Sequence, residues 1–372
     1  MKILHVSSAR APGGGERHLA DLARGLARRG HEVYAALRED SPLRAELLAS
    51  LPPRNVFTLP LTGALDLLSA HKLARLARDH EIDIIHAHLA RDYPPAALAA
   101  RRAPRTRLVI TRHVLFPMNR AQRLALSNAA RVIAVSGGVA RSLRARHIFP
   151  EHKIRVVPNA IDFARVEADL GGFERDAYRA ETLRSRAPLL VGTVGELSEV
   201  KGQDDFVRAA SLVARGRGGA VEFLVVGEDH SRGGENRARL EALIDELGLG
   251  GRVRLLGRTE ELARLLSSLD VFVSASRSEA FGLAMVEAMA CGCAVVSTAT
   301  EGAREILEDG ATGVVVPVGD PPALAAAVES LLDDAPRRNS LAARAREAAR
   351  SRFDLARMVE ATERVYEEAV SS

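Results

Sequence analysis

The sequence predicts an α/β protein with two domains, each built on a parallel sheet. Short β-prone runs alternate with longer helical patterns, which is typical of βαβ units, and they form two separate series along the chain. The chain has 372 residues, of which 47% are apolar. This length exceeds what one hydrophobic core usually organises, so we expect two globular domains of roughly 150–200 residues each.

The first series contains five expected strands and one clear amphipathic helix. The helix, at about 16–29, follows a glycine turn at 13–15 and ends at Gly30. The strands are expected at 3–6, 32–37, 82–86, 108–111 and 132–135.

The second series contains six expected strands. They lie at 189–194, 221–226, 253–256, 271–274, 294–297 and 313–316. Between the two series, residues 159–188 are polar and irregular enough to hold the crossover from one domain to the next.

Two glutamates, Glu279 and Glu287, stand eight residues apart in the segment S-R-S-E-A-F-G-L-A-M-V-E at 276–287. The run before this segment is β-prone and its second half is helix-forming. We therefore expect Glu279 on a loop and Glu287 within the following helix.

The amides of Phe281, Gly282 and Leu283 would then lie at the start of this helix, where unpaired donors and the helix dipole suit a diphosphate or sugar oxygens. An ionised carboxylate accepts two or more O–H donors, so one glutamate could hold a transferred sugar and the other a ribose. Glutamates are also common as solvated helix charges. The wider sequence decides between these interpretations.

The wider sequence resembles the GT4 family of retaining glycosyltransferases over nearly the whole chain. The segment at 276–317, which includes E-A-F-G-L-A-M-V-E at 279–287 and E-G-A-R-E-I-L at 301–307, is similar to the donor-binding region of that family. Four further motifs occur in the family's order, namely G-G-G-E-R-H at 13–18, T-R-H-V at 111–114, V-P-N-A-I-D at 157–162 and V-G-E-L-S-E-V-K-G at 194–202. The resemblance implies the GT-B architecture of two facing Rossmann-like domains with parallel sheets and a cleft between them.

The resemblance also implies domain bounds and ligand contacts. The last helix, at about 355–370, would return to the first domain. This gives an N-terminal acceptor domain of 1–160 plus about 353–372 and a C-terminal nucleotide-sugar donor domain of 161–352. In such sheets the ligand lies at the carboxyl ends of the strands. The resemblance places Gly14 against the donor diphosphate or sugar, Glu279 on the sugar and Glu287 on the ribose.

Lys201 is one of four lysines in a chain with 48 arginines. A compact ammonium neutralises a phosphate as a point charge, and by resemblance Lys201 does so for the donor β-phosphate. The chain departs from the family at Glu196, where the motif usually has an arginine. A carboxylate there must point away from the diphosphate, bind a ligand hydroxyl, or lie near an arginine such as Arg258 or Arg277.

His113 follows the strand at 108–111 and matches the family's histidine that reaches the donor sugar and the reacting centre, where an imidazole can donate or accept. His86 and His88 alternate on one strand face like a metal pair, but no third ligand is evident, so we expect a structural or acceptor-side role. The chain has no Asp-x-Asp motif. We therefore expect no metal and no other cofactor, with Lys201 and helix amides in the metal's place.

The residues and the resemblance together imply transfer of a sugar from a nucleoside diphosphate to a hydroxyl acceptor, with retention of the anomeric configuration. We favour UDP over GDP or ADP as the nucleotide. His113, Lys201 and Glu279 are the candidate catalytic residues. No carboxylate is placed as the paired nucleophile of retaining glycosidases, so we expect a front-face mechanism dominated by electrostatic stabilisation of the leaving diphosphate.

Three alternatives stay open from the sequence. A sugar phosphorylase or a nucleotide-sugar epimerase would share the architecture, and so would a non-catalytic nucleotide-binding partner of another transferase. Glu196 is the one feature that favours the non-catalytic partner, whereas Lys201, Glu279 and Glu287 oppose it.

The two halves of the chain carry opposite charge. Residues 1–160 contain 26 Lys and Arg against 12 Asp and Glu, a net of +14, and residues 161–372 contain 26 against 36, a net of −10. Seven arginines fall between Arg101 and Arg123, which favours contact with an anionic membrane surface or an anionic acceptor. Nucleic acid is not expected, because aromatic residues are scarce.

The hydropathy pattern and the cysteine content indicate where the protein is located and which kinds of site it lacks. The chain contains no 18-residue uncharged apolar run and its first strand is too short for a signal peptide. We expect a cytoplasmic protein with peripheral contact to the inner face of the membrane, and a cell-envelope glycan or lipid-linked acceptor. Cys291 and Cys293 have no companion pair, so we expect small buried residues and neither a disulfide framework nor a zinc site.

Overall fold

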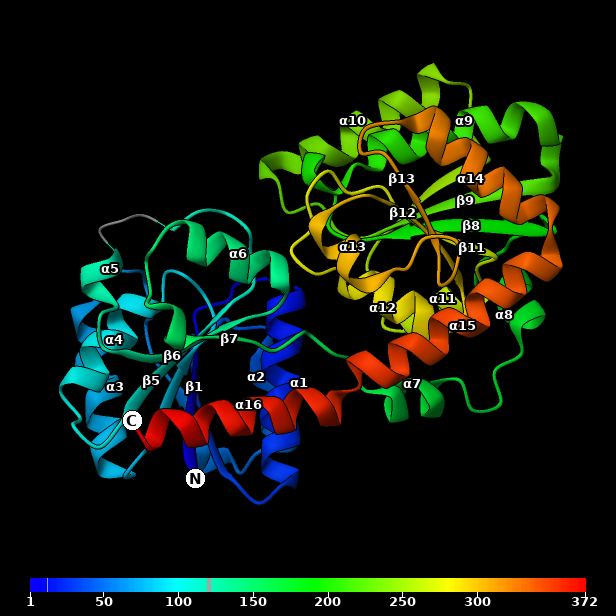
Figure 1. Cartoon of the computed structure of the whole chain (residues 1–372). Coiled ribbons are helices and arrows are strands. Elements are labelled where there is room, and N and C mark those ends of the chain that lie inside the picture. Colours follow the sequence, from blue (N-terminus) through cyan, green and yellow to red (C-terminus); the bar gives the residue numbers. More distant parts are fainter. Residues whose placement is uncertain (12, 119–121) are drawn as a thin grey trace. The chain divides into compact units, whose positions relative to one another are not determined.

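The computed structural model describes residues 1–11, 13–118 and 122–372 of the chain. The chain folds into two compact units (Figure 1). The N-terminal unit comprises residues 1–160 and 353–372, and the C-terminal unit comprises residues 161–352. Each unit is a parallel sheet with helices packed against it, so the predicted fold class of two parallel-sheet α/β domains is confirmed.

The N-terminal unit has a seven-stranded parallel sheet in the order β3-β2-β1-β4-β5-β6-β7. Its strands are β1 (Lys2–Ser7), β2 (Glu32–Leu37), β3 (Val56–Thr58), β4 (Ile84–Ala87), β5 (Arg107–Arg112), β6 (Ala129–Ala134) and β7 (Ile154–Val156). Its helices are α1 (Gly14–Arg28), α2 (Leu43–Ser50), α3 (Leu67–Asp79), α4 (Tyr93–Arg101), α5 (Gln122–Ala125), α6 (Gly137–Ala145) and α16 (Leu355–Val370), with short 3-10 turns η1 (Pro53–Asn55) and η2 (Glu151–Lys153).

The strand order of this sheet reverses between β1 and β4, which pair directly. In open α/β sheets ligands bind outside the carboxyl ends of the strands at such a switch point. The residues at the ends of β1 and β4 are therefore the first place to look for a site in this unit.

Helix α16, at the end of the chain, belongs to the N-terminal unit. It packs on α1 and on strands β5 and β6, and its Val359 and Tyr366 share a buried core with Ile3 and Leu19. Gly25 of α1 permits a close approach of the two helices, because a Cβ there would lie 2.4 Å from Cγ2 of Val359. The core of this unit is complete only with the last helix in place.

The C-terminal unit has the same topology in a six-stranded parallel sheet, with the order β10-β9-β8-β11-β12-β13. Its strands are β8 (Leu189–Val194), β9 (Val221–Val226), β10 (Val253–Leu256), β11 (Val271–Ser274), β12 (Ala294–Thr298) and β13 (Val314–Val316). Its helices are α7 (Phe163–Asp169), α8 (Arg175–Glu181), α9 (Gln203–Arg217), α10 (Glu235–Glu246), α11 (Leu262–Ser268), α12 (Leu283–Ala290), α13 (Glu301–Ile306), α14 (Pro321–Asp333) and α15 (Ala335–Phe353), with 3-10 turns η3 (Glu199–Lys201), η4 (Gly218–Ala220) and η5 (Arg232–Gly234). The switch point lies between β8 and β11, which pair directly.

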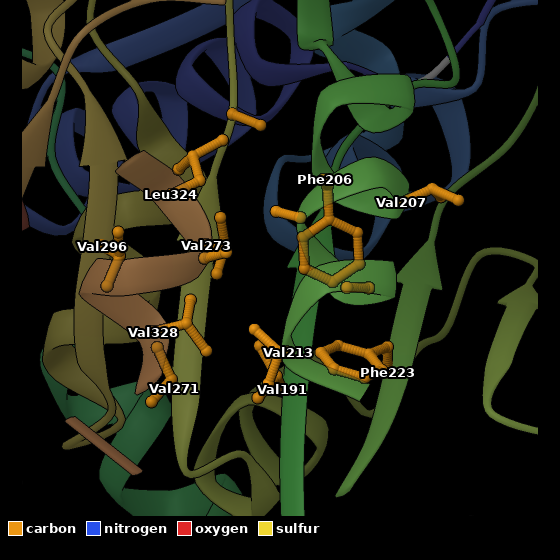
Figure 2. Close-up of a cluster of buried hydrophobic side chains, with 14 of the residues drawn as sticks. Val191, Phe206, Val207, Val213, Phe223, Val271, Val273, Val296, Leu324 and Val328 are labelled. Carbon is orange, nitrogen blue, oxygen red and sulfur yellow. The ribbon is translucent and has the colours of Figure 1, made fainter. Parts of the chain in front are cut away.

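Figure 2 shows part of the hydrophobic core of the C-terminal unit. Phe206 and Val213 of α9 and Leu324 and Val328 of α14 pack against sheet residues such as Val273. Strands β11 and β12 are buried along their whole length. Parallel strands covered on both faces need such continuous apolar runs, which explains why these strands could be predicted.

The structure differs from the sequence-based expectations in three places. Strands β3 and β7, of three residues each, lie at the two edges of the N-terminal sheet and are too short to show a periodic pattern. Helix α1 begins at Gly14, so the glycine turn runs into the helix. Residues 159–188, expected to be irregular, contain α7 and α8.

Within the described part of the chain, none of the helices has the length and the apolar character that crossing a membrane requires. Cys291 and Cys293 are both buried, as the sequence predicts.

Candidate active site

Lys201 and Glu279 form an ion pair at the switch point of the C-terminal sheet. Lys201 ends the 3-10 turn that follows β8, and Glu279 lies between β11 and α12. The Lys201 Nζ donates to Oε2 of Glu279 at 2.6 Å. The two side chains are 32% and 15% exposed, so the pair is partly desolvated and still accessible to a ligand.

The loops that carry this pair are held together at close range. Gly202 has a φ of +63°, and a Cβ there would lie 2.1 Å from the carbonyl oxygen of Ala275. The Arg277 amide donates to the carbonyl of Val200 at 2.8 Å. Because only glycine combines this conformation with this contact, the position next to Lys201 requires glycine.

Helix α12 begins at this site without a side-chain cap. Its N-cap, Gly282, has a φ of +109°, and Phe281 before it is buried. A Cβ at Gly302 of α13 would lie 2.1 Å from the carbonyl oxygen of Phe281. The first amides of a helix have no intrahelical acceptor, and the helix dipole adds a positive potential for an anion.

A small pocket surrounds the pair. The polar residues in its lining include Thr193 at the end of β8 and Ser274 at the end of β11, which the sequence analysis did not select. Both residues could have been identified from the sequence, because each is a hydroxyl side chain near the carboxyl end of an otherwise apolar strand. The described lining residues are Thr193, Val194, Lys201, Gln203, Ser274, Ser276, Glu279, Gly282, Ala284 and Met285.

Glu287 lies inside α12 and is 8% exposed. It is not one of the described lining residues of the pocket. A glutamate is almost never fully buried unless it is paired, so the interpretation of Glu287 as a solvated helix charge is wrong.

Glu196 has an exposed side chain, and its backbone carbonyl accepts a hydrogen bond from Nε2 of Gln203 at 2.8 Å. Arg277, one of its two expected partners, donates instead to Asp204 at 2.7 Å and Asp205 at 3.1 Å. Arg258, the other, is exposed. Of the three expected arrangements, compensation by Arg277 is therefore wrong, since that guanidinium is engaged by two carboxylates at the start of α9.

In the N-terminal unit, His113 follows β5 and Gly14 begins α1. A Cβ at the neighbouring Gly15 would lie 3.6 Å from the His113 ring, so the glycine-rich start of α1 borders this histidine. Burial lowers the pKa of His113 well below its usual range, and the charges of His18 and Arg112 act in the same direction. The His113 imidazole is therefore neutral near neutral pH.

His113 belongs to a cluster of five histidines at the carboxyl ends of β1, β4 and β5, which we call the histidine cluster. The ring centroids of His113 and His18 are 4.8 Å apart, and those of His86 and His88 are 4.1 Å apart. Three of the five members, His86, His88 and His113, were candidates from their sequence context. The other two come from β1 and α1 and have no motif in common with them; the full set is His5, His18, His86, His88 and His113.

The sequence of each unit matches a known protein family. Residues 174–348 match the family described as glycosyl transferases group 1, and residues 12–165 match the family described as glycosyltransferase family 4.

Named relatives match almost the whole chain. A D-inositol 3-phosphate glycosyltransferase from Kineococcus radiotolerans is 30% identical over 416 residues, covering 99% of this chain and 94% of the relative. An N-acetyl-alpha-D-glucosaminyl L-malate synthase from Bacillus anthracis is 28% identical over 366 residues, covering 93% and 91%.

A solved structure is similar over its full length. The crystal structure of HepE from Anabaena in complex with UDP and glucose has a TM-score of 0.85 and 27% sequence identity, with 100% of each chain covered. Together, these matches and the two parallel-sheet units establish that the chain belongs to glycosyltransferase family 4 and is a glycosyltransferase of GT-B type.

Proposed function

We propose that the protein is a retaining glycosyltransferase that moves a sugar from a UDP-sugar to a hydroxyl acceptor. The observation that carries this proposal is the Lys201–Glu279 pair at the switch point of the C-terminal sheet, next to an uncapped helix N-terminus. UDP is favoured as the nucleotide because the similar structure of Anabaena HepE holds UDP and glucose.

Lys201 would neutralise the donor diphosphate. Its ammonium donates to Glu279 at 2.6 Å, which keeps it in the pocket and partly compensates its charge. A diphosphate would exchange this single carboxylate for several anionic oxygens, and the released Glu279 oxygen would accept a hydroxyl of the sugar. The exchange couples phosphate neutralisation to sugar orientation.

The start of α12 would bind the anionic and sugar oxygens through the amides of Phe281, Gly282 and Leu283. Phe281 is buried, so its contribution is limited to its backbone. Glu287, buried in the same helix, is proposed to hold the ribose.

The N-terminal unit would contribute Gly14 and the neutral imidazole of His113, which can donate or accept one hydrogen bond at the sugar. The acceptor hydroxyl attacks the anomeric carbon on the face that the UDP leaves. As the new C–O bond forms and the bond to the diphosphate breaks, the hydroxyl proton passes to the departing phosphate oxygen. We propose that this front-face transfer requires no metal, because Lys201 and helix amides supply the positive charge.

For the acceptor, we propose a cell-envelope glycan or a lipid-linked glycan, with peripheral contact to the inner face of the cytoplasmic membrane. The N-terminal half carries the basic excess, and Phe116 and Leu124, within the arginine-rich stretch, are 71% and 81% exposed. Basic residues with exposed apolar side chains suit an anionic membrane surface. One arginine of this stretch, Arg120, lies outside the described residues.

The test is a thermal-shift panel of UDP, GDP, ADP and CMP with their common sugar conjugates, followed by product analysis with a panel of hydroxyl acceptors. A ligand that binds only the folded state raises the melting temperature. We expect a selective shift with UDP and one UDP-sugar, and an α-linked product from an α-linked donor.

The other outcomes identify the alternatives. Donor turnover without an acceptor would indicate an epimerase, and turnover that requires inorganic phosphate would indicate a phosphorylase. Nucleotide binding without any turnover would indicate a non-catalytic partner, and no shift with any nucleotide would refute the proposal.

A further inference from the structure

Four side chains of the histidine cluster have unused ring nitrogens. Both nitrogens of His18, both of His113, Nδ1 of His88 and Nε2 of His5 are buried without a hydrogen-bond partner among the described residues. A buried polar atom left unpaired costs about 1–3 kcal/mol. Six such atoms in one place call for an explanation, and a bound ion is one of the recognised explanations.

Three of these side chains have the geometry of a metal site. One nitrogen from each of His18, His88 and His113 lies within 4.8 Å of the other two. A tetrahedral zinc ion binds imidazole nitrogens at about 2.0–2.1 Å, which places its ligand atoms about 3.4 Å apart. Histidine rings turn through a broad range of χ2, so small rotations bring the three nitrogens onto one ion.

The three imidazoles are in the form that binds metals. Burial lowers the pKa of His18 to about 4 and lowers the pKa of His88 and of His113 well below the usual range. Neutral imidazole offers a lone pair to a cation. Their side chains come from α1, from the residue after β4 and from the loop after β5, so the fold assembles a site that no local motif announces.

His5 of β1 supports the His88 ligand. Nδ1 of His5 lies 3.0 Å from Nε2 of His88. When Nε2 of His88 carries the proton and donates this hydrogen bond to Nδ1 of His5, the lone pair of the His88 ring is on Nδ1. That atom is one of the unused ring nitrogens. Metal-binding histidines are usually oriented in this way through their second nitrogen.

A second triple of close nitrogens, from His5, His86 and His88, is a poorer site. Nδ1 of His86 lies 2.6 Å from the Tyr366 hydroxyl and Nε2 lies 2.7 Å from the Thr111 hydroxyl. An ion there would break existing hydrogen bonds, whereas an ion held by His18, His88 and His113 would leave both hydrogen bonds of His86 intact.

We propose that His18, His88 and His113 form a binding site for a transition-metal ion such as Zn²⁺. A set of three imidazoles suits Zn²⁺, Co²⁺, Ni²⁺ or Cu²⁺ and does not suit Mg²⁺ or Ca²⁺. Three protein ligands leave a fourth position for water. His113 is partly exposed while His18 and His88 are buried, so the ion enters past His113.

The ion would act as an inhibitor of the transferase. Bound metal uses the His113 nitrogen that the transfer reaction would need. This consequence rests on the proposed function, whereas the binding of the metal does not.

The test titrates Co²⁺ into the untagged, chelator-treated full-length protein and follows the visible absorption of tetrahedral Co²⁺. We expect saturation at one equivalent and displacement by Zn²⁺. His18→Gln and His88→Gln each lower the affinity by at least about tenfold. His71→Gln, an exposed histidine of α3, is the matched control and leaves the affinity unchanged.

One further variant and one crystallographic measurement distinguish the proposed site from the second triple. His86→Gln retains binding at the proposed site and loses it if the second triple is the site. If the variants fail to fold by circular dichroism, a zinc-edge anomalous peak at His18, His88 and His113 in crystals of the parent protein replaces them.

The proposal is overturned if the parent protein shows no saturable binding, if the anomalous map has no peak there, or if His86→Gln abolishes binding while His18→Gln does not. Transfer activity separates the two parts of the argument. Saturating Zn²⁺ that binds at the site without slowing transfer removes the proposed role of His113 and leaves the metal site standing.

Discussion

At the scale of single residues, Lys201 is the side chain on which the proposed donor site most depends. It is one of four lysines among 48 arginines, and it meets Glu279 in a pocket at the switch point. A flexible ammonium can leave one carboxylate and follow a phosphate, whereas a planar guanidinium tends to stay in a bidentate pair. Arg277 is already engaged, because its Nη2 donates to both Asp204 and Asp205.

Lys201→Ala should lower kcat/KM for sugar transfer by about 10²–10³-fold, because one preorganised charge at the leaving group is lost. Lys72→Ala, on the exposed surface of α3, is the matched control and should retain full activity. Initial rates of UDP release with and without acceptor measure both. A loss below about tenfold for Lys201→Ala would place the diphosphate elsewhere.

At the scale of secondary-structure elements, glycines determine how closely the loops of the donor site approach. Gly202 joins η3 to α9 with a positive φ and abuts the Ala275 backbone. Gly302 plays the same part where α13 meets Phe281. These positions connect the chain's local conformation to the placement of Lys201 and Gly282.

Gly202→Ala should lower the free energy of unfolding by about 3 kcal/mol or more, because backbone strain is added to a clash with a carbonyl oxygen. Gly251→Ala is the matched control. Its φ of +82° is also positive, but a Cβ there meets nothing within 4 Å, so it should lose only about 1 kcal/mol. Urea unfolding measures both. Equal losses would mean that the loop relaxes away from Ala275.

At the scale of the whole molecule, the candidate sites of the two units differ in the charge and the burial of their side chains. The C-terminal site is a charged pair that remains partly exposed. The N-terminal unit holds five neutral histidines, four of which are buried, and α16 supplies Tyr366 as a partner for one of them. Burial lowers the pKa of His5 to about 3 and that of His18 to about 4, from an ordinary 6.5.

The buried histidines should make the N-terminal unit unstable in acid. Their unfolded forms bind protons below pH 6.5 and their folded forms do not, so their contribution to stability is complete above pH 6.5 and is lost as the pH falls toward 4. Each such histidine contributes a slope of about 1.4 kcal/mol per pH unit. Asp92 acts in the opposite direction, because burial raises its pKa to about 6 and its contribution declines as the pH rises through that value.

Urea unfolding in a chelating buffer at pH 7.5, 6.5 and 5.5 measures this effect. We expect stability to fall steeply below pH 6.5. His5→Gln should reduce the slope of the free energy of unfolding against pH by the contribution of one proton, which is about 1.4 kcal/mol per pH unit. His152→Gln, an exposed control, should leave the slope unchanged. Stability that is flat between pH 7.5 and 5.5 would mean that the histidines are protonated in the folded state.

The sequence alone was sufficient for the elements whose signal is local. Continuous apolar runs such as those of β11 and β12 predicted buried parallel strands, since both faces of these strands are covered. Strands β3 and β7 were not predicted, because a strand of three residues at a sheet edge is too short to show a periodic pattern of apolar residues. Lys201 and Glu279 could be chosen from their residue types and motifs, and the structure places their charged atoms 2.6 Å apart.

Only the tertiary structure decided which distant side chains meet. The partners of Arg277, the burial of Glu287 and the five-histidine cluster depend on strand order and helix packing. These bring together residues that are far apart along the chain, such as His86 and Tyr366, which are 280 positions apart. Periodicity and motif spacing report on the chain's neighbours along the sequence. They do not report on neighbours across a sheet, so local chemistry was determined by the sequence itself and the assembly of the sites was determined by the fold.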